Sequence, residues 1–544
     1  MNKRTILILL SILSVAAFLR FYKLTLIPPS LEWDEVSTGY DANSILKTGR
    51  DQYGHFLPLT FRSLDDYKPP LYTYLTVGSI AIFGWNDFAV RFPAAFLGVL
   101  AVLTTFGMTQ ALFKNKKLSL LTTLFLAISP WHVNFSRLAL ETNSTIFFTT
   151  AGMWAFIKGL RSGKYLPLAS IFFGLDLFLY HNARVFIPFI SVILILLYWK
   201  DLWTQKKYVF ISAFIAFVFV IALLPIITST AGLMRFQGTS IFTSAVSLET
   251  AELKQTYQHW RQVDTEHNEG LIGSIFHNSK TLFTLLILKN YLTHFDPNFW
   301  VFTNDSFRHH AGAVGLLYIV DLPLIYIGTT YMLQQKNKQA GLLILAWALI
   351  APIPASLTRD VPHALRSEIF LPTLQIAIAF AFCWIQTYFA GKNLRRKVII
   401  AFLLVGYFLN SSFFIHQYYV HFNEDTSEYW VYGRREAALF AESIKDKYDR
   451  ILVSTKLEQP QAFFLYYLKY DPVKYLAQGG TFSGGWAEDR NKFDKYQFRP
   501  IDFSKMQDGK TLFIGQPEEF PSGITTLKKI YYLNGKEAIW IVAG

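Results

Sequence analysis

A succession of long apolar stretches is the feature that most constrains how this chain can fold. A helix needs roughly 20 apolar residues to cross the ~30 Å hydrocarbon core of a bilayer. Only 16% of the residues are charged, against about 25% in soluble domains. The sequence therefore predicts an α-helical polytopic membrane protein with about eleven spans, approximately at 5–22, 88–113, 118–135, 144–160, 165–181, 185–199, 208–229, 313–333, 339–357, 369–389 and 397–416.

Two further apolar stretches, 69–84 and 281–302, are resolved by the distribution of basic residues. Cytoplasmic loops of membrane proteins carry an excess of Lys and Arg. If neither stretch crosses and the N-terminus is cytoplasmic, one side collects Lys3, Arg4, Lys114, Lys116, Lys117, Lys158, Arg161, Lys164, Lys200, Lys206, Lys207, Lys336, Lys338, Lys392, Arg395, Arg396 and Lys397. We therefore expect both stretches to be interfacial or re-entrant helices. The net charge of +13 then sets orientation, and no nucleic-acid partner is expected.

The same orientation gathers the polar segments on the outer face of the plasma (inner) membrane. These segments are 23–87, 136–143, 181–184, 230–312, 358–368 and the chain beyond about 420. From 421 the composition becomes mixed, with helical patterns near 436–447 and 459–469 and strand-like runs at 449–454, 511–515 and 530–543. The sequence predicts a transmembrane domain at 1–420 and a small extracytoplasmic α/β domain at 421–544.

The first outer segment contains the charged residues that best suit a catalytic site. It holds the adjacent acids Asp34 and Glu35, a second pair at Asp65 and Asp66, and then Lys68 in a Lys-Pro-Pro turn. Carboxylates beside a cation suit a site that activates a hydroxyl group and binds a phosphate. An ordinary solvated loop between two spans is the competing interpretation.

An amphipathic pattern predicts a helix over 31–47 within this loop, ended by Gly49. We expect the helix to lie on the membrane, with Trp33, Val36, Tyr40 and Leu46 toward lipid. Such a helix would hold Asp34 and Glu35 near the headgroups.

Three other outer segments offer charged groups. Arg137 and Glu141 are four residues apart and would share a helix face, either in a site or as an interfacial salt bridge. The sequence YHNAR carries His181 and Arg184, as part of a site or as interfacial anchors. The short link 358–368 contains Arg359, His363 and Arg366 close together in sequence, which favours an anion-binding site.

Other ionisable residues allow two interpretations. Asp176 and Asp321 fall inside predicted spans, where a carboxylate either lines a cavity or bonds a neighbouring helix. The spacing of His294, Asp296, His309 and His310 matches no zinc motif, which favours structural roles.

The order of these motifs resembles a known family. The Asp-Glu pair after the first span, the Lys-Pro-Pro turn, GWNDFAVRFPAAFLG at 84–98, and SPWHVNFSR with a downstream acid resemble glycosyltransferase family 39 and the lipid A aminoarabinose transferases, over roughly 1–420. The resemblance implies the GT-C membrane fold and a polyprenyl-phosphate sugar donor. It also implies that Asp34 is the catalytic base, that Lys68 meets the donor phosphate, and that Glu141 is the acid of the second outer loop.

One position departs from the aminoarabinose transferases. They carry a metal-binding glutamate immediately before the lysine, and Tyr67 occupies that position here. Asp65 or Asp66 could substitute, so a divalent metal stays an open alternative.

The sequence thus predicts a membrane glycosyltransferase that moves a sugar from a polyprenyl-phosphate donor to a lipid, glycan or protein acceptor on the outer face. Asp34 would accept the proton, with Glu35 orienting it or binding the acceptor. Lys68, with Arg184, His363 or Arg366, would stabilise the departing phosphate, and a single displacement would invert the anomeric carbon. The alternative is a transporter or flippase that uses Asp176 and Asp321, which should show paired interrupted helices in two halves. No such symmetry is found in the sequence.

Overall fold

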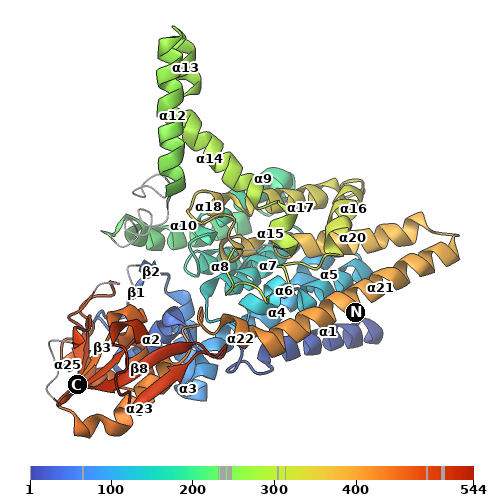
Figure 1. Ribbon diagram of the computed structural model, residues 1–544. Helices are drawn as coiled ribbons and strands as arrows, with labels where there is room; N and C mark the ends of the chain where they lie inside the picture. Colours follow the sequence, from blue (N-terminus) through green and yellow to red (C-terminus); the bar gives the residue numbers. More distant parts are fainter. Residues whose placement is uncertain are drawn as a thin grey trace.

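The computed structural model describes residues 2–63, 66–230, 232, 240–241, 248–302, 305–312, 314–485, 488–503 and 509–544. A bundle of helices forms the larger part of the molecule, and a sheet-containing domain lies at one end of it (Figure 1). The expected architecture, a polytopic helical protein with a small C-terminal α/β region, is confirmed.

The helical part is built from elements of very different length. They are α1 (Lys3–Phe21), α2 (Trp33–Thr48), α3 (Leu71–Phe83), α4 (Asp87–Phe113), α5 (Lys116–Ile128), α6 (Pro130–Phe135), α7 (Glu141–Gly159), α8 (Leu166–Asp176), α9 (Ala183–Thr204), α10 (Lys206–Thr228), α12 (Leu248–Glu266), α13 (Gly270–Phe276), α14 (Ser279–Thr293), α15 (Pro297–Val301), α16 (Asp321–Leu333), α17 (Lys338–Ile350), α18 (Ile353–Ser356), α19 (Ala364–Ser367), α20 (Thr373–Tyr388), α21 (Asn393–His416) and α22 (Phe422–Thr426).

Among the described residues, seven helices are long and apolar enough to cross a membrane, or eight if the bent pair Ala364–Phe370 and Thr373–Tyr388 is one span. Several expected spans fall on shorter helices, such as α5, α8 and α16. The exact number of spans therefore stays a prediction. Helix α3 is short as well as apolar, in keeping with the expectation that 69–84 does not cross.

The segment 281–302 contains most of α14 and all of α15. Residues Gly270–Thr293, which include α13 and α14, are long and apolar enough to cross. In Figure 1, α12 and α13 project away from the bundle, and α14 leads back to it. The membrane placement of this segment stays a prediction.

The C-terminal domain contains a mixed six-stranded sheet in the order β4-β5-β3-β6-β8-β7. The central strand β3 (Arg450–Val453) runs parallel to β5 (Tyr496–Phe498) and to β6 (Thr511–Gly515). The remaining strands pair antiparallel: β4 (Lys492–Phe493), β7 (Lys528–Tyr531) and β8 (Glu537–Ala543). Helices α23 (Arg434–Ile444) and α24 (Pro460–Tyr467) fall on the two predicted helical patterns, and α25 (Pro472–Ala477), which was not predicted, completes the domain.

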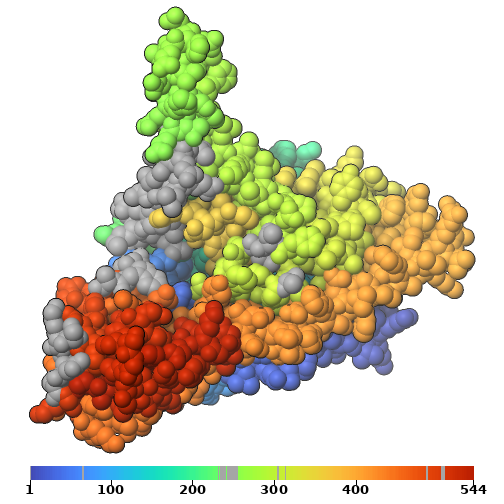
Figure 2. All heavy atoms as spheres, in the orientation of Figure 1, coloured from blue at the N-terminus to red at the C-terminus, as the bar shows by residue number. Residues whose placement is uncertain are grey.

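Helix α2 begins and ends close to its expected bounds, but its surroundings differ from the prediction. Gly49 ends it in a left-handed conformation, with φ 70°. Val36 and Tyr40 are buried, and the Tyr40 ring packs against Trp85 and Tyr475. Helix α2 therefore lies between α3 and the C-terminal domain, and the expectation that Val36 and Tyr40 meet lipid is wrong, whereas Leu46 is exposed. Figure 2 shows the red domain seated against the blue first outer segment.

Candidate active site

The two acids of the first outer segment lie in the first turn of α2. Glu32 is the N-cap of this helix, and Glu35 completes a capping box by accepting the Glu32 backbone N–H. Carboxylates are favoured there because the helix dipole is positive at its N-terminus. Asp34 and Glu35 are adjacent on a helix, so their side chains diverge by about 100° and meet different surroundings.

Asp34 faces Lys68. The Lys68 ammonium is 2.9 Å from Asp34 Oδ1 and also donates to the Asp34 carbonyl. The Ser63 hydroxyl donates to the same carboxylate at 3.0 Å. Burial by itself would raise the pKa of Asp34, but Lys68 and Ser63 hold that pKa below its ordinary value. Asp34 is therefore ionised, and its side chain is 28% exposed.

A short hairpin positions these partners. Strand β1 (Phe61–Ser63) pairs antiparallel with β2 (Asp66–Lys68), in a register that places Phe61 opposite Lys68 and Ser63 opposite Asp66. Pro69 and Pro70 follow, and proline cannot donate to a strand ladder, so β2 ends at Lys68 and α3 begins at Leu71. Lys68 is thereby fixed against the start of α2.

Glu35 lies in a different environment. Its carboxylate accepts two hydrogen bonds from Arg91, each 2.9 Å long, and one of 2.8 Å from the Ala139 backbone N–H. Both side chains of the pair are 0% exposed. Glu35 therefore joins α2 to α4 and to the second outer loop, and the expectation that it orients Asp34 or binds acceptor gives way to a bracing role.

Two more carboxylates interact electrostatically with Lys68. Glu141 begins α7 and is buried, which raises its pKa against the opposing charge of Lys68. Glu32 is buried as well, and its burial raises its pKa to about 8 although Arg308 lies 2.7 Å away. Sequence reasoning singled out neither Glu32 nor Arg308, because Arg308 lies in a segment remote in sequence whose fold no pattern predicted.

His181 connects the backbone of Tyr67 to Arg184. Its Nε2 donates to the Tyr67 carbonyl at 3.0 Å, and its Nδ1 accepts from Arg184 Nη1 at 3.0 Å. Arg184 also donates from Nε to the Leu177 carbonyl. Its Nη2 is buried and makes no hydrogen bond to any residue that the structure describes. Arg184 thus retains a donor beside the Tyr67–Lys68 strand.

Arg366 is held by its own loop. Its Nη1 donates to Thr358 Oγ1 at 2.8 Å and to the Arg359 carbonyl. Its backbone carbonyl accepts from the Asn182 side chain, which places α19 beside the His181–Arg184 segment. His363 caps α19 and contacts Asp305 rather than Lys68.

The other residues predicted for the site lie apart from the Asp34–Lys68 pair. Arg137 is fully buried and donates to the carbonyls of Leu19, Arg20, Lys23 and Ile27, so it caps the C-terminal end of α1. It lies before α7 rather than in it, and no ion pair joins it to Glu141 in the described residues. The shared helix face is therefore wrong. Asp66 lies in β2 and accepts from the Tyr67 N–H, and Asp65 lies outside the described residues.

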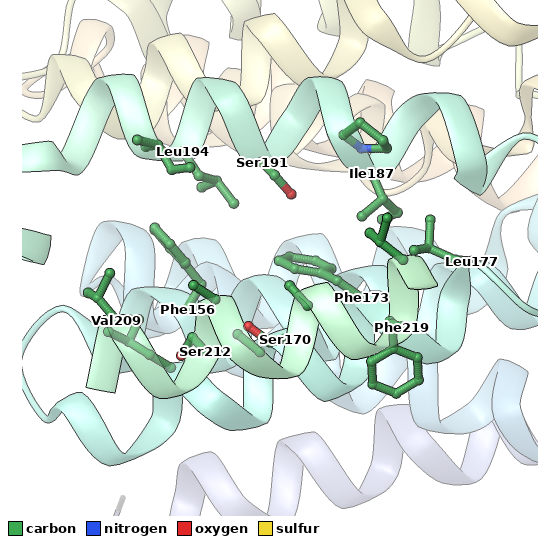
Figure 3. Close-up of a pocket in the computed structure, with 18 of the residues that line it drawn as sticks. Phe156, Ser170, Phe173, Leu177, Ile187, Ser191, Leu194, Val209, Ser212 and Phe219 are labelled. Carbon is green, nitrogen blue, oxygen red and sulfur yellow. The ribbon is translucent and has the colours of Figure 1, made fainter. Parts of the chain in front are cut away.

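An apolar groove of about 350 Å³ opens between α8, α9 and α10. Figure 3 shows Ile187, Ser191 and Leu194 of α9 facing Phe156 and Phe173 across it. Leu177 lines the same groove, and its carbonyl is the acceptor of Arg184 Nε. Leu177 thus links the wall of the groove to Arg184.

The two carboxylates in predicted spans bond neighbouring helices. Asp321 accepts from the Tyr407 hydroxyl at 2.5 Å and from the Tyr318 N–H at 3.0 Å. Asp176 accepts from the Thr149 hydroxyl at 2.6 Å. Neither lines the apolar groove.

Sequence comparison matches residues 67–226 to the family described as dolichyl-phosphate-mannose-protein mannosyltransferase. The putative mannosyltransferase YkcB of Bacillus subtilis (strain 168) is 28% identical over 171 residues, 30% of this chain and 22% of that protein. The match thus spans about a fifth of that relative's length.

Two solved structures share the fold. ArnT from Cupriavidus metallidurans bound to undecaprenyl phosphate superposes with a TM-score of 0.54 at 12% identity, covering 99% of this chain and 97% of that one. The oligosaccharyltransferase AglB from Archaeoglobus fulgidus, in complex with an inhibitory peptide and a dolichol-phosphate, gives 0.51 at 13% identity, covering 86% and 64%. The resemblance found in the outer-loop motifs is confirmed. The chain is a multi-pass membrane protein with the GT-C fold, and its residues 67–226 match the dolichyl-phosphate-mannose-protein mannosyltransferase family.

Proposed function

We propose that this protein is a membrane glycosyltransferase that moves a sugar from a polyprenyl-phosphate donor to an acceptor on the outer face of the plasma membrane. The observation that carries the proposal is the partly exposed Asp34–Lys68 pair at the start of α2. The family match begins at residue 67, next to this lysine. The C-terminal domain would then be extracytoplasmic, because it packs on the same segment.

The pair has to separate before transfer, since a carboxylate that is bonded to a lysine is a weak base. A donor phosphate competes with Asp34 for the Lys68 ammonium, because a charged hydrogen bond to phosphate is strong. When the Lys68 ammonium binds the phosphate instead of Asp34, its positive charge lowers the pKa of Asp34 less. Donor binding thereby makes Asp34 a better proton acceptor at the moment the base is needed.

Transfer is then a single displacement. The acceptor hydroxyl or amine gives its proton to Asp34 while its oxygen or nitrogen bonds to the anomeric carbon. The bond from that carbon to the phosphate oxygen breaks, and the lipid phosphate leaves with the electron pair. The anomeric carbon is inverted because only one displacement occurs. Lys68 and the unpartnered Nη2 of Arg184 stabilise the charge that develops on the phosphate.

The apolar groove supports a lipid-linked donor. Its walls are almost entirely hydrocarbon and aromatic rings, and the lining residue Leu177 accepts a hydrogen bond from Arg184 through its carbonyl. A prenyl chain in this groove would place its phosphate near Arg184 and the Tyr67–Lys68 strand. Arg366 lies on the neighbouring loop. Its backbone carbonyl accepts a hydrogen bond from the Asn182 side chain, which helps to hold the residues around Arg184 in place.

The transporter alternative has no supporting observation of its own. Asp176 and Asp321 are engaged with neighbouring helices, and the partly exposed Asp34 lies with Lys68 in the first outer segment.

Purified protein incubated with radiolabelled polyprenyl-phosphate sugars and a membrane extract tests the proposal. We expect transfer from one donor, reduced by ~10² or more in Asp34→Asn because proton acceptance is lost. Asp66→Asn, in the same hairpin, is the matched control and should retain most activity. Equal transfer by wild type and Asp34→Asn, with Glu141→Gln inactive, would move the base to α7.

A further inference from the structure

Three metal-ligating side chains meet where two outer segments touch. Asp305 and His309 belong to the segment after α15, and His363 precedes α19. One potential ligand atom from each lies within 4.8 Å of the others. We propose that Asp305, His309 and His363 form a binding site for a divalent transition metal, Zn²⁺ being the ion that fits best.

The distances suit a small tetrahedral ion. Bonds of ~2.1 Å to nitrogen and oxygen place neighbouring ligand atoms of a tetrahedron about 3.4 Å apart. His309 Nδ1 is 2.9 Å from Asp305 Oδ2, and His363 Nδ1 is 3.3 Å from the same oxygen. Small shifts of these side chains would therefore admit the ion in place of the contacts that now join them.

The ligand chemistry points to the same class of ion. Two imidazoles and one carboxylate suit Zn²⁺ better than Mg²⁺ or Ca²⁺, which prefer oxygen. Their side chains are 10–15% exposed, so the ion would be largely shielded yet could keep one position for water or another ligand.

A second layer of contacts orients the ligands. His294 Nδ1 donates to the Asn290 carbonyl, so its Nε2 accepts the backbone N–H of His363. The Ala364 N–H donates to Asp305 Oδ2 at 2.7 Å. Such contacts are typical around metal ligands, whose orientation they fix.

The site would join the two segments that carry Arg308 and Arg366. Arg308 precedes His309 and pairs with Glu32 at 2.7 Å, two residues before Asp34. Arg366 is in α19, three residues after His363. A bound ion would thus hold two cations beside the first outer segment. The site is separate from Tyr67, and zinc binding does not require the proposed sugar transfer.

The test uses the full-length protein in detergent, stripped with a chelator and then titrated with Zn²⁺ or Co²⁺ alone. We expect one ion per chain by elemental analysis, visible absorption bands of tetrahedral Co²⁺, and slower hydrogen exchange at 305–312 and 358–368. His309→Gln and Asp305→Asn should weaken binding at least tenfold. His310→Ala is the matched control, since His310 contacts the Gly312 carbonyl instead.

Two results would overturn the site: less than one ion per wild-type chain at saturating Zn²⁺, or unchanged affinity in both His309→Gln and Asp305→Asn. Gel filtration and thermal unfolding of each variant separate a lost ligand from a lost fold. Sugar transfer by metal-free protein would leave the proposed function intact whatever the zinc result.

Discussion

Replacing Glu35 by glutamine should damage stability rather than chemistry. Arg91 makes five hydrogen bonds, two to Glu35 and three to the carbonyls of Leu24, Pro28 and Ser30. Glutamine removes the negative charge and leaves the guanidinium, which is 0% exposed, without a counter-ion. Removing one partner of a buried pair costs about 3–5 kcal/mol, a large part of a typical unfolding free energy of about 5–15 kcal/mol.

The assay compares unfolding free energies in detergent with transfer rates per folded molecule. Glu436→Gln is the matched control, because Glu436 pairs with Lys528 at 2.7 Å on the surface, where its side chain is 47% exposed. An exposed pair contributes roughly 0–1 kcal/mol, so this variant should resemble wild type. If Glu35→Gln were as stable as wild type yet lost ~10² in transfer, Glu35 would take part in the chemistry and the bracing role would be refuted.

Three further predictions follow from the site and its orientation. Lys68→Met should raise the Asp34 pKa, because Lys68 lowers it; the acid limb of kcat/KM should therefore move to higher pH, and an unmoved limb would place the base elsewhere. Arg184→Ala and Arg366→Ala should weaken donor binding, Arg184→Ala by at least tenfold, because a charged hydrogen bond is worth ~1.5–3 kcal/mol; equal affinity in both variants would exclude them from the phosphate site. In a Cys383→Ala background, a cysteine at Lys116 should resist an impermeant reagent from outside while one at Lys536 reacts, and the reverse pattern would invert the topology.

Local sequence patterns were sufficient to predict the membrane class, the α/β character of the C-terminal domain, and the approximate bounds of α2. Each depends on local information: apolar length, residue periodicity, or a glycine that can adopt the left-handed conformation after a helix. The order of motifs also indicated the GT-C fold. The Asp34–Lys68 pair was expected as two members of one site, because both lie in a single loop whose motifs resemble the family.

Tertiary structure decided the role of each charged residue. Asp34 and Glu35 are adjacent and chemically alike, yet one meets Lys68 at a partly exposed site and the other meets Arg91 in the interior. Arg137 faces the end of α1 rather than Glu141, since the chain turns between α6 and α7. Asp305, His309 and His363 come together although no spacing reveals it, because the distance between ligands in space is set by how the outer segments pack. Local sequence does not specify that packing, since the burial that fixes it comes from residues far apart in the chain.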